Sequence, residues 1–312
     1  MRNARIAVVG ATGAVGAVTM RLLRERGHEN VRAFASSRSA GTTLDGGIVV
    51  EEATPEALES AGVDLALFSV GTSASRALVP HAMRGGAVAV DKSSAYRLVD
   101  GVPLVVPEVN GERAHDNDGV VANPNCCTIP LSCVLGPLHE AAGLKRVRVA
   151  TYQAVSGKGA QRLAELLAEP SSDHDLSMDW DWEGDETDEE SKIRLEAQKI
   201  LELPDLPISP TTVRVPVLVG HAEAVWVELE ASLSPEQAAS VLGSARSVRL
   251  VDVPTPRMSA QTDEVLVGRI RADRASDGNG LALFLACDNL NKGAALNAIQ
   301  IAELLLGDRV AA

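Results

Sequence analysis

Residues 5–16, RIAVVGATGAVG, determine the fold predicted for the first half of the chain. A β-branched apolar run leads into three glycines, which open a segment, residues 14–23, with the spacing of a helix. Gly10, Gly13 and Gly16 let backbone N–H groups approach a pyrophosphate at the helix N-terminus, where the helix dipole favours an anion. The spacing is looser than the strict dinucleotide motif, and a tight turn without a ligand is the alternative. The strand-turn-helix context favours a dinucleotide site.

The same alternation of strand and helix continues through the first 140 residues and predicts a doubly wound parallel sheet. Beyond residue 145 the strands are longer and alternate in hydrophobicity, which is typical of a mixed or antiparallel sheet with helices on one face. We therefore predict an α/β protein with a Rossmann-type domain and an α+β domain. Their expected bounds are residues 1–126 and 127–288, with a C-terminal helix at 289–312 packing back on the first domain.

Composition excludes several kinds of partner. The 312 residues include 29 Lys and Arg against 42 Asp and Glu, and a formal net charge of −13 argues against nucleic acid or an anionic membrane. The chain begins almost directly with a strand and has no apolar stretch of about 18 residues, so we expect no membrane span and a cytoplasmic location. Four cysteines fit neither a disulfide framework nor paired metal-ligand spacing, which predicts reduced thiols and no metal.

An acidic stretch interrupts the second half. Residues 173–190, DHDLSMDWDWEGDETDEE, hold ten acids in eighteen positions and few apolar anchors, so we expect a solvated surface excursion. Its tryptophans, Trp180 and Trp182, either tether it or face a partner subunit.

The end of the second predicted strand bears on the cofactor. An NAD site usually presents Asp or Glu there, whereas the 2′-phosphate of NADP requires Arg. The chain has Ser36, Ser37, Arg38 and Ser39 and no acid, which favours NADP. The alternative is a plain polar loop in which Arg38 is a solvated charge.

Two adjacent cysteines follow the turn in NPNCCTIPL, residues 123–131. A thiolate at a helix N-terminus is stabilised by the dipole and by exposed N–H groups, so a nucleophile is expected here. This argument favours Cys126 because it is nearer the turn, but it leaves Cys127 open. Cys133 and Cys287 lie in apolar segments and are expected to be inert core residues.

A nucleophilic thiol needs a base, which is usually histidine. His221 follows a glycine between two predicted strands, where a rigid scaffold can direct an imidazole into a cleft. Taken alone, such a histidine is more often structural. Arg214, seven residues earlier, has the planar fork for a bidentate contact with a carboxylate.

Several stretches together resemble the aspartate-semialdehyde dehydrogenase family. They are GATGAVG, DKSSAYR, PLVVPEVN, NPNCCTI, TYQAVSG, RVPVLVGHAEAV and DNLNKGAALNAIQIAE, in this order along nearly the whole chain. The resemblance implies an NADP-binding Rossmann domain and a domain for catalysis and dimerisation, in a homodimer or homotetramer. It also implies NADPH-dependent reductive dephosphorylation of L-β-aspartyl phosphate to L-aspartate 4-semialdehyde through a cysteine thioester, serving lysine, threonine and methionine biosynthesis.

The resemblance assigns roles to individual residues. Cys126 matches the nucleophile, His221 the acid/base group and Gln153 the glutamine that orients the reacting group. Arg214 matches the arginine that holds the substrate α-carboxylate, and Asn125 belongs to the same substrate-binding set.

A phosphate site is implied at Arg97 and Lys192, and Glu189 matches the acid that pairs with the substrate amino group. Glu189 and Lys192 are three residues apart and share a helical face, so a surface ion pair is the alternative. The cofactor-binding residues that the resemblance implies are Gly10, Thr12, Gly13, Ala14, Val15, Ser36, Arg38, Ser39, Gly71, Ser156, Gly157 and Asn289.

This chain departs from the family pattern at Cys127, which replaces a serine, at Ala222, at Lys158 and in the acidic stretch. Two other functions remain open. One is a related reductase of the same fold, acting on N-acetyl-glutamyl phosphate or malonyl-CoA. The other is an inactive paralogue that binds NADP. Retention of Cys126, Gln153, Arg214 and His221 argues against the latter. The combination of Glu189 and Arg214 favours a free amino acid as the substrate.

Overall fold

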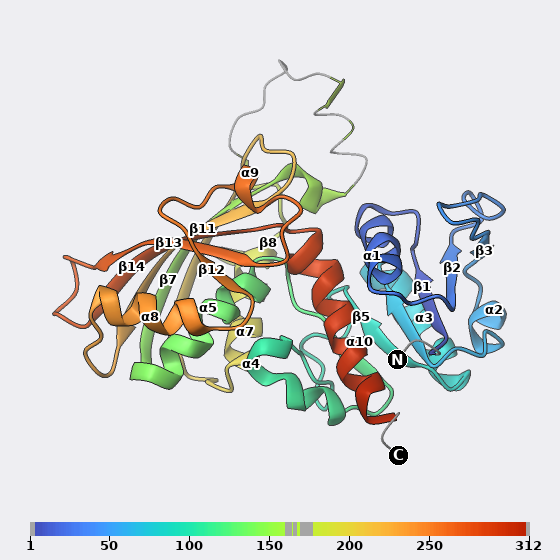
Figure 1. The fold of residues 1–312 in the computed structure, drawn as a ribbon, viewed down its shortest axis with the longest axis horizontal. Coiled ribbons are helices and arrows are strands. Elements are labelled where there is room, and N and C mark those ends of the chain that lie inside the picture. Colours follow the sequence, from blue (N-terminus) through green and yellow to red (C-terminus); the bar gives the residue numbers. More distant parts are fainter. Residues whose placement is uncertain (1–3, 160–163, 165–166, 169–176, 310–312) are drawn as a thin grey trace. The chain divides into compact units, whose positions relative to one another are not determined.

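A computed structural model describes residues 4–159, 164, 167–168 and 177–309 (Figure 1). The chain forms two compact units, one made of Met1–Pro124 and Ala294–Ala312 and the other of Asn125–Gly293. Residues 125–126 and 289–293 therefore belong to the second unit, whereas the sequence analysis placed them with the first. Local hydrogen bonding explains the difference, because Asn125 binds the start of the following helix and the Gly293 N–H donates to the Asp288 carbonyl at 2.9 Å.

The first unit contains a six-stranded sheet in which every pair is parallel. The strand order is β3-β2-β1-β4-β5-β6. The order reverses between β1 and β4, and open α/β sheets bind their ligands at the carboxyl ends of the strands beside such a point. The predicted doubly wound sheet is therefore confirmed. Its strands are β1 (Ile6–Val9), β2 (Val31–Ala35), β3 (Val50–Glu52), β4 (Leu65–Phe68), β5 (Val88–Asp91) and β6 (Val120–Ala122).

Helices cover both faces of this sheet. Ile6 and Val8 of β1 pack in a core with α1 (Ala14–Glu25) and α10 (Leu296–Arg309). The alternate residues Ala7 and Val9 pack in a second core with α2 (Pro55–Glu59) and α3 (Thr72–Arg84), as strand side chains alternate between faces. The shorter α4 (Pro107–Asn110) and η1 (Gly111–His115) precede β6.

The second unit contains a mixed sheet of six strands in the order β10-β7-β11-β14-β13-β12. The β10/β7 and β12/β13 pairs are parallel and the others antiparallel, which confirms the predicted mixed sheet. Its strands are β7 (Leu144–Gln153), β10 (Ile208–Arg214), β11 (His221–Leu229), β12 (Val248–Leu250), β13 (Val265–Ala272) and β14 (Gly280–Cys287). Among its described residues, this unit also contains α5 (Thr128–Ala142), η2 (Val155–Lys158), β8 (Trp182–Glu183), β9 (Glu186–Thr187), α7 (Asp188–Ile200), α8 (Pro235–Ser244), α9 (Pro256–Ser259) and the start of η3 (Asn291–Ala295).

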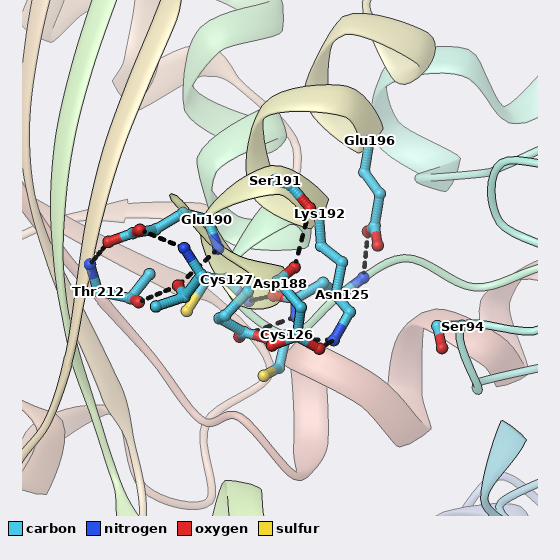
Figure 2. Close-up of polar contacts among 12 residues, drawn as sticks. Ser94, Asn125, Cys126, Cys127, Asp188, Glu190, Ser191, Lys192, Glu196 and Thr212 are labelled. Atoms are coloured by element: carbon cyan, nitrogen blue, oxygen red, sulfur yellow. Dashed lines mark hydrogen bonds and ion pairs between the residues drawn. The ribbon is translucent and has the colours of Figure 1, made fainter. Parts of the chain in front are cut away.

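Helix α5 packs on β7, β11 and β14, and α7 packs on β10. Helix α7 starts at a capping box, in which the Thr187 hydroxyl accepts from the Glu190 N–H and the Glu190 carboxylate accepts from the Thr187 N–H. Glu190 also accepts from the Thr212 N–H of β10 at 2.9 Å (Figure 2). One buried carboxylate thus fixes the start of α7 against the sheet, which sets the position of the helix that carries Glu189 and Lys192.

The acidic stretch is less solvated than its composition indicated. Residues 173–176 lie outside the described residues. Farther along, residues 182–190 form β8, β9 and the first residues of α7, and Glu189 and Glu190 are buried. The expectation of a surface excursion along the whole stretch is therefore wrong, because hydrogen bonds within the fold offset the burial of these carboxylates. In the part of the chain that the structure describes, no helix combines the length and hydrophobicity of a membrane span.

Candidate active site

Cys126 lies immediately before helix α5. Cys127 is the N-cap of that helix, and the Asn125 side chain accepts a hydrogen bond from the Cys127 N–H at 2.8 Å. Cys126 is partly exposed, whereas Cys127 is fully buried. Burial raises the pKa of the Cys127 thiol well above its ordinary value, and the neighbouring Cys126 adds to the shift. Of the two adjacent sulfurs, only that of Cys126 combines access to solvent with the positive end of the helix dipole.

The His221 imidazole contacts the Cys126 sulfur. His221 begins β11, rather than lying in the preceding turn, and is fully buried. Its Nε2 is 3.2 Å from Cys126 Sγ, and its Nδ1 accepts a hydrogen bond from the Ala154 N–H at 2.9 Å. A ring nitrogen that accepts a hydrogen bond carries no proton, so the neutral imidazole holds its proton on Nε2. That proton points toward Cys126 and can stabilise a thiolate.

This tautomer also bears on metal binding. Cys126, Cys127 and His221 offer three possible ligand atoms within 4.8 Å of one another. A metal ion binds the lone pair of a neutral ring nitrogen. In His221 the Nδ1 lone pair accepts from the Ala154 N–H and Nε2 carries the proton, so neither nitrogen has a lone pair left for a metal. The arrangement therefore suits a hydrogen bond from the imidazole to a Cys126 thiolate better than metal coordination.

A buried carboxylate, Glu189 of α7, lies beside the cysteine. Its Oε1 accepts from Asn125 Nδ2 at 2.9 Å and from Gln153 Nε2 at 3.0 Å. Burial raises the pKa of Glu189 and the charge of Cys126 adds to the effect, while the hydrogen bond from Asn125 opposes it. Lys192 Nζ is 3.9 Å from Glu189 Oε2 and 2.5 Å from Asp188 Oδ2. The structure thus brings together the predicted residues Asn125, Gln153, Glu189 and Lys192.

Arg214, the last residue of β10, is only 5% exposed. Its Nη1 donates to the Ala154 carbonyl at 3.0 Å, so one residue binds Arg214 through its C=O and His221 through its N–H. A Cβ atom on Gly157 would lie 3.2 Å from Arg214 Nη1 and 3.3 Å from His221 Nε2. The guanidinium and the imidazole therefore approach the same point, and glycine leaves that point open.

Two buried carboxylates near the site were missed in the sequence. Glu196 of α7 accepts from the Asn125 N–H at 2.6 Å (Figure 2) and so holds the turn before Cys126. Glu223 of β11 is fully buried, and within the described residues neither of its oxygens accepts from a nitrogen or oxygen donor. Burial and then the charge of Cys126 raise the pKa of Glu223 well above its ordinary value, and the weak donor that opposes this shift is the neighbouring Cys127 thiol. Their spacing in the sequence could have revealed them. Glu196 lies two helical turns after Glu189 and Glu223 lies two strand positions after His221, so each shares a face with a predicted site residue.

The predicted dinucleotide residues of the first unit surround the start of α1. Gly10 has φ +89°, and a Cβ on Gly16 would lie 2.0 Å from the Gly10 carbonyl oxygen, so the loop requires both glycines. The N-cap Gly13 has no side chain to occupy the first N–H groups, those of Ala14 and Val15. This donor set fits the pyrophosphate of a dinucleotide.

The neighbouring loops carry the other predicted residues of this unit. Thr12 Oγ1 lies 3.3 Å from Ser39 Oγ, which joins the loop after β1 to the loop after β2. Ser36 and Arg38 are exposed in the latter loop, and Gly71 is an N-cap without a side-chain bond at the start of α3.

The remaining predicted residues are held by hydrogen bonds of their own. Arg97 is buried in the first unit and donates to the carbonyls of Asn123 at 3.0 Å and Lys92 at 2.7 Å. In the second unit, Asn289 Nδ2 donates to Ser156 Oγ at 3.0 Å, and Asn289 Oδ1 accepts from the Gly220 N–H at 2.8 Å. Ser156 and Asn289 thus fix the loop that leads to His221.

Two family models match the chain. The NAD-binding domain of semialdehyde dehydrogenases matches residues 5–117, and their dimerisation domain matches residues 135–183 and 178–292. Fold and site therefore define the class, which is that of semialdehyde dehydrogenases with a nicotinamide dinucleotide cofactor.

Individual relatives narrow this class. The chain is 46% identical over 342 residues to aspartate-semialdehyde dehydrogenase of Corynebacterium melassecola, covering 96% of this chain and 99% of that protein. The structure of aspartate semialdehyde dehydrogenase II from Vibrio cholerae complexed with ASA has a TM-score of 0.94 and 37% identity over 99% of both chains. That of aspartate semialdehyde dehydrogenase with NADP from Candida albicans has a TM-score of 0.78 and 26% identity, covering 98% of this chain and 99% of that one. The chain belongs to the aspartate-semialdehyde dehydrogenase family, which confirms the resemblance found in the sequence.

Proposed function

We propose that this protein catalyses the reversible, NADPH-dependent reductive dephosphorylation of L-β-aspartyl phosphate to L-aspartate 4-semialdehyde. The observation that carries the proposal is the contact of 3.2 Å between Cys126 Sγ and His221 Nε2 in a member of this family. A thiolate held by an N–H donor is a nucleophile suited to an acyl carbon. The product serves the synthesis of lysine, threonine and methionine.

Covalent catalysis divides the reaction into two steps. The Cys126 thiolate attacks the acyl carbon, the bond from that carbon to the phosphate oxygen breaks, and a thioester forms as phosphate leaves. Bound NADPH supplies the hydride that reduces the thioester carbon. The resulting thiohemiacetal collapses to the aldehyde and the thiolate, and the one proton consumed overall leaves with the phosphate. His221 keeps its Nε2 proton and donates a hydrogen bond with it, first to the oxyanion and then to the departing Cys126 thiolate, because the bond from the Ala154 N–H holds Nδ1 as the acceptor.

Charged residues select the substrate. Glu189 is the partner for the α-ammonium group and Arg214 for the α-carboxylate, while Asn125 and Gln153 orient the acyl group beside Cys126. The hydrogen bonds that tie Asn125 and Gln153 to Glu189 support this assignment. Arg97 and Lys192 are the phosphate residues. Their local charge allows a chain of net charge −13 to bind a dianion.

NADP is the proposed cofactor. Arg38 and the hydroxyls of Ser36 and Ser39 supply donors for a 2′-phosphate, and no carboxylate follows β2 directly. The Candida albicans relative is described with NADP, which supports the same choice. The other cofactor residues proposed are Gly10, Thr12, Gly13, Ala14, Val15, Gly71, Ser156, Gly157 and Asn289. Arg38→Ala should raise KM for NADP and leave KM for NAD unchanged, and equal effects on both cofactors would refute this assignment.

We further infer a division of labour, in which the first unit provides most of the cofactor-binding residues and the second carries catalysis and subunit contact in a homodimer. The dimerisation-domain match supports this inference. The sheet face of the second unit supports it as well, since Tyr152 is 37% exposed there and its ring centroid lies 6.1 Å from that of Phe284. Light scattering on the purified protein distinguishes a dimer from a monomer or tetramer.

The activity is tested by NADPH formation from L-aspartate 4-semialdehyde, phosphate and NADP. We expect turnover by the wild type, none by Cys126→Ala and retained turnover by Cys127→Ala. Loss in the Cys127 variant alone would overturn the choice of nucleophile. NADPH formation only with N-acetyl-glutamate semialdehyde and phosphate, or NADPH oxidation with malonyl-CoA in the reverse direction, would instead establish one of the related reductases. Binding of NADP without any turnover would indicate an inactive paralogue.

A further inference from the structure

Residues 177–180 of the acidic stretch hold Arg214 from several sides. Ser177 and Arg214 exchange two backbone hydrogen bonds, of 2.7 and 3.1 Å. Asp179 Oδ1 accepts from Arg214 Nε at 3.1 Å, and the Arg214 guanidinium carbon lies 4.5 Å from the centre of the Trp180 ring. Together with the Ala154 carbonyl on Nη1, these contacts fix the plane of the guanidinium.

Lys158 adds a third charge to this group. Its Nζ donates to the Asp179 carbonyl at 2.5 Å and lies 3.3 Å from Asp179 Oδ2. Although burial raises the pKa of Asp179, Arg214 and Lys158 together hold it below its ordinary value, so the carboxyl is ionised at neutral pH. Two cations and one anion leave one net positive charge. The group therefore still attracts a carboxylate, even though Arg214 already has an acidic partner.

The guanidinium nitrogen that Asp179 binds shows whether Asp179 competes with a substrate carboxylate or positions Arg214 for it. A carboxylate that imitated the substrate would bind two guanidinium nitrogens at once, either Nε with Nη2 or Nη1 with Nη2. Asp179 instead binds Nε, and in the described part of the chain Nη2 makes no hydrogen bond. Nη1 faces the open point above Gly157 that His221 also approaches. The Ala154 carbonyl uses one of the two N–H groups of Nη1, so the other N–H of Nη1 and those of Nη2 are left for a ligand on the side of the thiol and imidazole.

We infer that Asp179 and Trp180 are positioning residues, which orient Arg214 so that its Nη edge receives the α-carboxylate of the substrate. This inference rests on the proposed function, because it assumes that Arg214 binds that carboxylate. It also explains three features of the sequence at once. Asp179 and Trp180 of the acidic stretch and Lys158, which replaces a small residue of the family pattern, all belong to the support of one arginine.

The test compares two aldehydes in the NADP- and phosphate-dependent assay. L-Aspartate 4-semialdehyde carries the α-carboxylate, whereas 3-aminopropanal has the same amino and aldehyde groups without it. For Asp179→Ala we expect KM for the semialdehyde to rise about tenfold, with kcat changed less than about twofold. The kcat/KM for 3-aminopropanal should stay at the wild-type value. Asp179→Asn keeps an acceptor for Nε and should recover part of the loss. Asp185→Asn, an exposed residue of the same stretch, is the matched control and should behave as the wild type.

A binding experiment separates this inference from the proposed function. L-2-Aminobutyrate carries the α-amino acid group and no aldehyde, and Trp180 fluorescence should report its binding because the ring lies on the guanidinium. Asp179→Ala should weaken that binding by the same factor as it raises KM, whether or not the protein turns over the semialdehyde. A lowered KM in Asp179→Ala would show that Asp179 competes with the substrate. Equal losses for both aldehydes, or unchanged binding of L-2-aminobutyrate, would equally overturn the inference.

Discussion

Glu223 provides the sharpest test of the electrostatics around the thiol. It is fully buried, it accepts from no nitrogen or oxygen donor in the described chain, and its pKa is raised well above 4.5. Glu223→Gln keeps the shape of the side chain but can never acquire the charge. The difference between wild type and variant therefore isolates the cost of ionising this one group in the folded protein.

The sign and size of that difference follow from proton linkage. Below about pH 4.5 the carboxyl is protonated in both the folded and the unfolded chain, and ionisation contributes nothing. As the pH rises, the unfolded chain loses this proton while the folded one retains it, which favours unfolding of the wild type. The free energy of unfolding of Glu223→Gln minus that of the wild type should therefore rise by about 1.4 kcal/mol per pH unit, until the pH reaches the pKa of Glu223 in the folded protein.

Urea unfolding followed by tryptophan fluorescence at pH 5.5, 6.0, 6.5 and 7.0 measures this slope. Glu230→Gln changes an exposed acid on the same segment and should show no slope against the wild type. Other titrating groups, including Glu189, are common to both proteins and cancel in the difference. A difference between Glu223→Gln and the wild type that is independent of pH would mean that Glu223 is ionised in the fold, and the argument from burial would be refuted.

Three further substitutions test other parts of the site. Thr187→Ala removes the capping box of α7 and should lower the free energy of unfolding by about 1 kcal/mol with kcat little changed, whereas an unchanged urea midpoint would contradict the role of the cap. The raised pKa of Glu189 means that its carboxylate is lost as the pH falls, so KM for the semialdehyde should rise toward acid pH, and this rise should be absent in Glu189→Gln. Gly157→Ala puts a methyl group 3.2 Å from Arg214 Nη1 and 3.3 Å from His221 Nε2. This variant should have a kcat/KM about tenfold lower than the wild type and an unchanged thermal unfolding temperature. Wild-type kinetics would show that the substrate does not occupy this point.

The fold of both units could be predicted because local signals agreed with one another. The run from Ile6 to Gly16 predicted a strand, a glycine turn and a helix. The strand order, which reverses between β1 and β4, follows from this strand–turn–helix motif and from the right-handed connections of parallel strands. The alternating strands after residue 145 likewise predicted a mixed or antiparallel sheet, of which the structure has the mixed form. The acidic stretch was the exception, because its charge predicted exposure while Glu189 and Glu190 find buried partners that are distant in sequence, such as Gln153 and Thr212.

The site could be predicted as a set of residue types but not as a geometry. Local argument left Cys126 and Cys127 unresolved, because both lie at the same helix start. What separates them in the structure is burial, together with the position of an imidazole 95 residues away in sequence. Glu223 and Asp179 were missed for a related reason. Their roles depend on their neighbours in the fold, and the sequence does not show which acids of an acidic chain are buried or paired.

The least predictable component is the peptide group of Ala154. Its N–H binds Nδ1 of His221 and its carbonyl binds Nη1 of Arg214, so it couples the tautomer of the acid/base group to the orientation of the carboxylate receptor. Neither bond depends on the methyl side chain, and no residue type at position 154 except proline would remove the N–H. Hydrogen bonds made by the backbone in this way therefore cannot be predicted from the residue type at the position. Because both side chains take their positions from one peptide group, a shift of the loop at 154–158 should change acid/base chemistry and substrate affinity together, whereas loss of Asp179 should change affinity alone.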